Sequence, residues 1–93
     1  MIAQDGHNVH LLKTDQREFI NTLERRKSVE HRKDDRFYQA GDFLVLREYY
    51  PDTKKYSNRN LLAVITCIEK DKHGIAEGYC NLSIRTLEVD RDI

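Results

Sequence analysis

Residues 43–50 read FLVLREYY and give the strongest strand signal in the chain. Both faces of this segment begin with apolar residues, which predicts a central strand that is buried on both sides. A second near-continuous apolar run, LLAVITCI at residues 61–68, predicts a neighbouring strand. Pro51 and the polar residues after it predict a hairpin loop over residues 52–57 between the two strands. These two strands should form the centre of a sheet.

Three shorter segments extend this sheet in the prediction, because their residues suit strands: residues 8–13, 28–33 and 78–84. The last of them, GYCNLSI, alternates cleanly and should point Cys80, Leu82 and Ile84 inward. Residues 86–93 either add an edge strand or trail off. The tally is about five strands.

One helix is predicted after the first strand. Asp15 and Glu18 have the spacing of a capping box, with Thr14 as an alternative cap. Apolar residues at 19, 20 and 23 form one stripe of a helix of about three turns. The basic run at 25–27 should then fall in its last turn, where cations favour the negative end of the helix dipole. The fold class expected is α+β, mainly β: a small, curved, partly open β-barrel with an early helix.

The length of 93 residues predicts a single domain, residues 1–93. The 16 Lys and Arg balance 16 Asp and Glu, which argues against a general polyanion binder but allows a local basic patch. No apolar run approaches the length of a membrane span, and the N-terminus lacks a signal pattern. We therefore expect a cytoplasmic protein with no membrane contact, and the sequence leaves its oligomeric state open.

The cysteines and histidines predict neither a metal site nor a cofactor. Cys67 and Cys80 lie in apolar segments and are expected to be reduced core thiols, with a disulfide as the alternative. His7 and His10 lie three residues apart but lack further ligands at fitting spacing. No glycine-rich phosphate loop or nucleophile elbow occurs.

The candidate site lies in the charged stretch of residues 24–42, ERRKSVEHRKDDRFYQAGD. In a strand over 28–33, Glu30 and Arg32 share one face, about 7 Å apart, and Lys27 can bend over it. A lysine, a carboxylate and a guanidinium in one cleft could bind a phosphate or a base edge. The alternative is a surface ladder of ion pairs.

Aromatic residues beside these charges leave two further alternatives. Phe37 and Tyr38 follow Arg36, so they could stack on bases, or Phe37 could pack under its own loop. Tyr49, Tyr50 and Tyr56 flank the hairpin turn. They could form a stacking platform or the commoner cross-strand aromatic pairs.

A family resemblance rests on residues that occur in order at compatible spacing: His10, Leu12, Lys13, Phe19, Lys27, Glu30, Arg32, Lys33, Asp35, Arg36, Gly41, Asp42, Leu44, Leu46, Glu48, Tyr49, Gly78, Tyr79, Leu82, Ser83 and Ile84. Over roughly residues 8–85 the chain resembles the DUF3850 family of the ASCH superfamily of PUA-like domains. The resemblance implies a PUA-like β-barrel with an early helix. It also implies a cleft, proposed to hold RNA or a nucleotide, lined by the signature Gly-x-Lys-x-x-Glu-x-Arg.

Lys27, Glu30 and Arg32 occupy the last three signature positions, and Arg25 stands where the signature has glycine. Some ASCH proteins resemble amidohydrolases of a modified cytidine, which use a lysine, a threonine three residues later and a later glutamate. Lys27 matches that lysine, but Glu30 stands at the threonine position and the later glutamate has no clear counterpart. The cleft therefore carries over, and the hydrolase residues do not.

The expected function is RNA or nucleotide binding. Lys27 and Arg32 would contact phosphate or a base acceptor, and Glu30 would orient Arg32 or accept from a base amine. Other candidates extend the site: Lys33 and Arg36 as an electrostatic track, and His10 as a wall residue. One alternative is a hydrolase of a modified nucleoside, with Lys27 activated by burial or cationic neighbours and Glu30 as acid or base. Another is a module that binds a protein partner.

Overall fold

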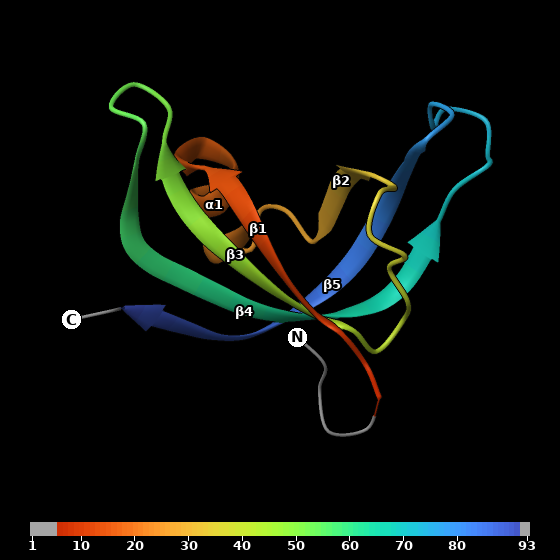
Figure 1. Ribbon diagram of the computed structural model, residues 1–93, viewed down its shortest axis with the longest axis horizontal. Helices are drawn as coiled ribbons and strands as arrows, with labels where there is room; N and C mark the ends of the chain where they lie inside the picture. The colour runs from red at the N-terminus through yellow and green to blue at the C-terminus, as the bar shows by residue number, and fades with distance from the viewer. Residues whose placement is uncertain (1–5, 92–93) are drawn as a thin grey trace.

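The computed structural model describes residues 6–91, which form one curled sheet and one helix (Figure 1). The elements follow in the order β1 Val9–Asp15, α1 Gln16–Leu23, β2 Val29–Lys33, β3 Phe43–Tyr50, β4 Lys55–Glu69 and β5 Tyr79–Arg91. The described part of the chain contains no helix of the length and apolar character needed to cross a membrane.

The five strands form a single sheet in the order β1-β3-β4-β5-β2. β1 runs parallel to β3, and all other neighbours are antiparallel. The long strands β4 and β5 curve, with two register shifts between them, so that the sheet curls into a half-barrel with β1 and β2 as its edges (Figure 1). This confirms a mainly β, partly open barrel of five strands with an early helix.

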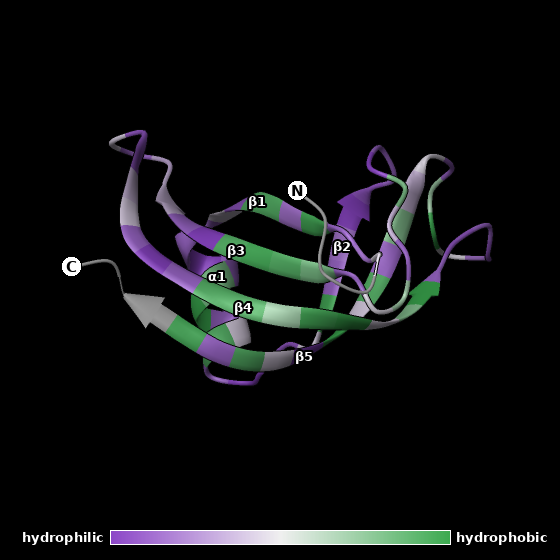
Figure 2. Ribbon diagram, turned by 60° about the horizontal axis from the view of Figure 1, so that its bottom comes forward, coloured by the Kyte–Doolittle hydropathy of each residue, from purple (hydrophilic) through white to green (hydrophobic). Residues whose placement is uncertain are grey.

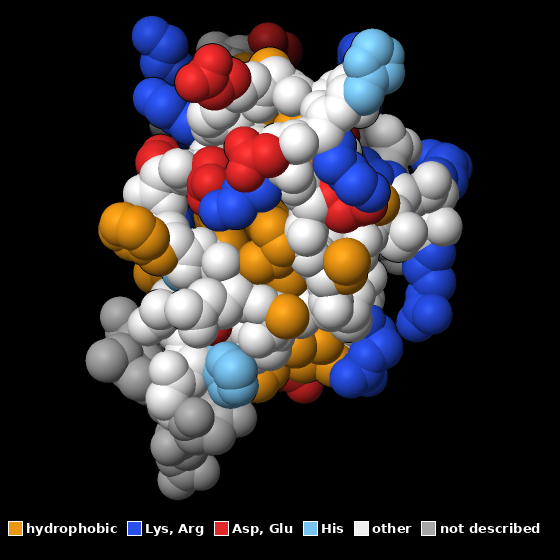
Figure 3. All heavy atoms as spheres, turned by 90° about the vertical axis from the view of Figure 1, so that its right-hand side faces the viewer, with side chains coloured by type: hydrophobic (Ala, Val, Ile, Leu, Met, Phe, Trp, Pro, Cys, Tyr) orange, Lys and Arg blue, Asp and Glu red, His pale blue; other side chains and the backbone are white. Residues whose placement is uncertain are grey.

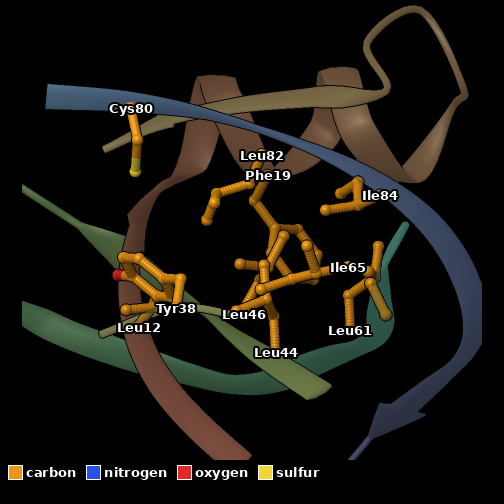
Figure 4. Close-up of a cluster of buried hydrophobic side chains, with 11 residues drawn as sticks. Leu12, Phe19, Tyr38, Leu44, Leu46, Leu61, Ile65, Cys80, Leu82 and Ile84 are labelled. Atoms are coloured by element: carbon orange, nitrogen blue, oxygen red, sulfur yellow. The ribbon is translucent and has the colours of Figure 1, made fainter. Parts of the chain in front are cut away.

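The core fills the concave side of the half-barrel, where α1 packs against the sheet (Figure 4). Phe19 of α1 is fully buried and meets Leu44, Leu46, Leu61 and Ile65 from the middle strands. Cys80, Leu82 and Ile84 also point inward, as their alternation predicts. The helix therefore covers the apolar concave face of the open sheet.

The prediction that residues 43–50 are buried on both faces is wrong. Leu44 and Leu46 are fully buried, whereas Phe43 and Val45, on the convex face, are only half-buried. The reason is that α1 covers only the concave face, so the convex face meets solvent. Figure 2 shows the apolar stretches of β1, β3 and β4 running side by side in the sheet.

The two long strands also differ from the expected boundaries. β4 begins at Lys55, so the hairpin turn spans only residues 51–54. β5 continues to Arg91 and pairs with β4 instead of adding a separate edge strand. A bulge at Thr66 turns Cys67 outward, because one extra residue reverses the alternation of faces. Both cysteines are free thiols, and the prediction of a core position is right for Cys80 and wrong for Cys67.

The helix begins where predicted and ends early. The Asp15 side chain caps its start by accepting from the Arg17 backbone N–H at 2.8 Å. α1 has eight residues and ends at Leu23, so the prediction that the basic residues 25–27 form its last turn is wrong. Instead, Arg25 adopts a left-handed backbone with φ of 62°. Its N–H donates to Thr22 O (3.1 Å) and that of Arg26 to Asn21 O (2.9 Å), which is a Schellman cap.

Replacing Arg25 by glycine should therefore stabilise the fold by about 0.5–1 kcal/mol, because glycine adopts this backbone without the steric penalty of a Cβ atom. Urea unfolding followed by circular dichroism measures the change. The matched control is Arg26→Gly, whose backbone is not left-handed. It should lower stability slightly by increasing the entropy of the unfolded chain. A shift of the same sign in both variants would contradict this assignment.

Candidate functional site

A cleft of about 570 Å³ opens where the two edges of the half-barrel approach each other. Its walls come from the end of β1, the start of α1, strand β2 and the hairpin that follows β3. Lys27, Glu30 and Arg32 all line it. The structure thus brings together the three residues that the sequence placed in one cleft.

Glu30 is the buried centre of this cleft. Its side chain is only 2% exposed, because Glu30 and Arg32 share the inner face of β2, as their spacing predicts. One carboxylate oxygen, Oε2, accepts from Arg32 Nε at 3.0 Å. The other, Oε1, is buried without a hydrogen-bond partner, and the Lys27 ammonium lies 3.4 Å from it. Burying half of a carboxylate without a hydrogen bond is costly, so this oxygen is a candidate ligand acceptor.

Lys27 lies between two carboxylates, Glu30 and Glu18 of α1, and forms an ion pair with each. Glu18 entered the sequence prediction only as a helix-capping residue. The lysine therefore has anionic neighbours, in contrast to the cationic ones that would activate it as a nucleophile.

Arg32 connects the two edges of the half-barrel. From β2 its guanidinium donates to Lys13 O (3.2 Å) and to Thr14 Oγ1 (3.1 Å) on β1. Arg36 reaches the same strand and donates to Leu11 O at 3.0 Å. Within residues 6–91, β1 has β3 as its single strand neighbour, so these carbonyls belong to its free edge. The side chains of the two arginines thus join the two edges of the half-barrel where, in the described part of the chain, no backbone hydrogen bonds do so. We call this line of contacts the seam.

The remaining candidates lie outside the cleft. Lys33 and Arg36 line a small hollow of about 120 Å³ that shares Arg32 with it. His10 is buried elsewhere, where its Nε2 lies 2.9 Å from Asp42 Oδ2 and its ring meets Tyr38 edge-on at 4.7 Å. The structure therefore does not bring His10 to the cleft wall.

Asp42, which the sequence analysis named only among the residues of the family resemblance, holds the N-terminal segment to the loop before β3. It accepts from the backbone N–H groups of Asn8 and Gln39, both at 3.0 Å, besides its contact with His10. Burial alone raises the pKa of Asp42, but these hydrogen bonds outweigh it and the pKa lies below its ordinary value. Asp42 therefore has a structural role, which no spacing along the chain indicated.

An aromatic wall borders the cleft at the hairpin. Tyr49, which lines the cleft, meets Tyr56 edge-on at 5.1 Å across the strands, which confirms the cross-strand pair. The Lys13 ammonium lies 4.7 Å from the centre of the Tyr49 ring. Lys13 and Thr14 were not predicted as cleft residues, because only the parallel pairing of β1 with β3 brings them there.

Phe37 does not pack under its own loop, so that prediction is wrong. Its side chain is 90% exposed and its backbone is left-handed (φ of 51°), while neighbouring Tyr38 is buried. The stacking alternative for Phe37 stays a prediction.

Charged groups of both signs border the apolar side chains on the side of the molecule shown in Figure 3. That face is therefore not uniformly basic.

The fold and cleft define a small curled β domain with a buried acid between two cations. The chain belongs to the DUF3850 family, a domain of unknown function, whose family model matches residues 9–84. A comparison with curated proteins finds no match. Within the described residues, no group of three or more His, Cys, Asp and Glu side chains is placed to hold a metal ion.

Proposed function

We propose that this domain binds RNA or a nucleotide-like ligand in the cleft lined by Lys27, Glu30 and Arg32. The observation that carries the proposal is the buried Glu30 Oε1, which has no hydrogen-bond partner and lies in a cleft of about 570 Å³. A base that donates an N–H would satisfy this oxygen, since carboxylates accept from exocyclic amines such as that of cytosine.

The groups around Glu30 complement the rest of a nucleotide. The Lys27 ammonium and the Arg32 guanidinium supply charged donors for a phosphate or a base acceptor. Tyr49, with the Lys13 ammonium above its ring, offers an aromatic wall. A ligand that matches all of these groups needs N–H donors, acceptor oxygens and a flat apolar surface, which nucleotides combine.

Several features support the wider setting of this proposal. The curled five-stranded sheet with an early helix is compatible with a PUA-like domain of the ASCH superfamily. The left-handed backbone at Arg25 retains the turn that glycine would allow at the first signature position. The free thiols of Cys67 and Cys80 favour action in a reducing compartment such as the cytoplasm.

The cleft favours binding over hydrolysis. The threonine hydroxyl in its lining belongs to Thr14, which already donates to Leu12 O and accepts from Arg32. To act as a nucleophile, this hydroxyl would have to break both hydrogen bonds.

The second candidate function is a protein-binding module, and the apolar convex face of the sheet favours it. There Leu11, 47% exposed, joins half-buried Val45 and Leu62 of the neighbouring strands in one apolar strip.

A thermal-shift screen against nucleosides, nucleotides and short single-stranded RNAs at low salt tests the proposal. A ligand at ~100 Kd should add about 2.7 kcal/mol. That corresponds to a rise in Tm of more than about 10 °C for a domain of this size. Product analysis of the same samples detects any hydrolysis.

Lys27→Ala should abolish the shift, because it removes the cation beside Glu30. The matched control is Lys72→Ala, since Lys72 also pairs with a glutamate, Glu69 at 2.7 Å, but lies outside the cleft. It should retain the full shift. If no compound stabilises the wild type, the proposal fails and the convex apolar strip becomes the leading site.

A further inference from the structure

A second hollow of about 420 Å³ lies on the other side of Lys27 from the cleft. It forms where the end of α1 and the start of β2 meet the middle of β4 and β5. Its eight lining residues include three cations, Arg25, Lys27 and Arg85, and no carboxylate. In a chain with balanced charge, this is a local basic hollow.

Irregular backbone shapes the hollow on each side. The bulge at Thr66 interrupts the β4–β5 ladder, and the Thr66 hydroxyl donates to Ser83 O at 3.2 Å. The left-handed Arg25 ends α1, and Ser28 is held to β5 by the hydrogen bond from Ile84 N to Ser28 O (3.0 Å). A regular helix and an unbroken ladder would not leave this space.

Four of the residues that line the hollow have side-chain donors without a partner within the described chain. Arg25 and Arg85 have neither an ion pair nor a hydrogen-bond partner for their side chains within the described chain, in contrast to Arg32 and Arg59. The hydroxyls of Ser28 and Thr86 are likewise without a partner there. Arginines with serine and threonine hydroxyls are the groups that bind phosphate oxygens in nucleic-acid complexes.

The hollow also adjoins the candidate site. It shares Lys27 with the cleft, and the cleft shares Arg32 with the small hollow that Lys33 and Arg36 line. Neighbouring depressions thus share one cation each, Lys27 just before β2 and Arg32 within it. A single nucleotide would fill only the central one, whereas a chain of nucleotides would follow all three.

We propose that the hollow of Arg25 and Arg85 binds a backbone phosphate of single-stranded RNA whose neighbouring base occupies the cleft. This inference rests on the proposed function and adds to it that the ligand is a chain of nucleotides and not a single one. Lys27, between the two sites, contacts the linkage that joins them.

The test measures binding of a five-nucleotide single-stranded RNA without terminal phosphates, by fluorescence anisotropy, over a series of salt concentrations. Arg85→Gln and Arg25→Gln should each weaken binding by up to about fivefold. Each should also reduce the slope of log K against log salt by about 0.7, the value for one single-strand phosphate contact. Arg26→Gln is the matched control, because its exposed side chain adjoins Arg25 but does not line the hollow. It should leave the slope unchanged.

Two small ligands separate the outcomes. A nucleoside, which has no phosphate, should bind wild type and both variants equally. If RNA binds the wild type but both slopes stay unchanged, the phosphate site is overturned while the proposed function stands. If a nucleoside 5′-monophosphate loses as much affinity as RNA in Arg85→Gln, the site holds a terminal phosphate and the polymer is overturned. If neither RNA nor nucleoside binds the wild type, the proposed function fails, and this inference with it.

Discussion

Replacing Arg59 by alanine is expected to destabilise the domain by about 3 kcal/mol, because it leaves the buried Glu48 carboxylate uncompensated. Glu48 is 1% exposed and accepts from Arg59 Nε at 3.0 Å, from its NH2 group at 2.9 Å and from Ser57 Oγ at 2.7 Å. Without the guanidinium, only Ser57 remains. For a domain of this size the loss should lower Tm by more than about 10 °C, measurable by calorimetry.

Arg47→Ala is the matched control. Its guanidinium lies 4.0 Å from the centre of the Tyr56 ring at the same hairpin, and it has no buried carboxylate partner among the described residues. Its loss should cost no more than about 1 kcal/mol. Equal effects of the two substitutions would show that the Arg59–Glu48 pair contributes no more than a surface contact.

The pH dependence of stability gives a second measure of the same pair. Burial raises the pKa of Glu48, but the hydrogen bonds from Arg59 and Ser57 dominate and the pKa lies below its ordinary value. A carboxylate with a lowered folded-state pKa stabilises the fold above its unfolded pKa of about 4.3. That contribution is lost as pH falls through the folded value. In Arg59→Ala burial would prevail, so mild acid should then favour the fold.

This pair also matters for the position of the helix. The Arg59 guanidinium lies 5.1 Å from the centre of the Phe19 ring, and Phe19 is the fully buried anchor of α1. One turn of this helix carries Glu18, which forms one wall of the cleft and pairs with Lys27. The buried ion pair therefore links the β3–β4 hairpin to the geometry of the candidate site.

The alternation of apolar and polar residues predicted the strands, because a strand with one buried face needs an apolar residue at every second position. Alternation in residues 78–84 marks the inner face of β5, and the inward positions are those that the structure buries. The apolar runs of β3 and β4 led to one wrong prediction, that both faces of β3 are buried. The convex face is also apolar, but no other element covers it within the described chain. Burial on two faces requires a second layer, and only the tertiary arrangement shows that α1 covers one face alone.

The local irregularities could not be predicted from single residues. Glycine normally marks a left-handed helix end, but Arg25 takes that backbone here under the constraint of the Schellman hydrogen bonds. The bulge at Thr66 has no glycine to signal it, although it decides that Cys67 points outward. The bulge depends on the pairing of β4 with β5, which no local pattern encodes, whereas the helix end is local but has no glycine to announce it.

The candidate site was predictable in part. The two-residue spacing placed Glu30 and Arg32 on one face of β2. In the structure their side chains meet there, with Arg32 Nε donating to Glu30 Oε2 at 3.0 Å. The contacts of Arg32 with β1 follow from the curl of the sheet, which brings its first and last strands in the sheet order together. No spacing along the chain encodes that approach.

Glu30→Met is expected to abolish most ligand affinity while changing stability by less than about 1 kcal/mol. Methionine has a similar shape and removes Oε1, a buried oxygen that has an ion pair with Lys27 but no hydrogen-bond partner, so its loss should cost little stability. The partners it leaves, Arg32 and Lys27, are 23% and 25% exposed and can turn to water or to their other contacts. A ligand loses a charged acceptor, which corresponds to about 10- to 150-fold in Kd.

Glu48→Met is the control that separates a site from a structural ion pair. Glu48 is equally buried, but both of its oxygens are hydrogen-bonded, so its loss should cost about 2–3 kcal/mol. Urea unfolding and ligand titration are measured on both variants. If Glu30→Met destabilises the fold as much as Glu48→Met, Glu30 is a structural residue. If it keeps wild-type affinity, the ligand does not contact Glu30. Low affinity combined with intact stability is the result expected of a carboxylate that is held ready for a ligand, because stability at such a position is given up for function.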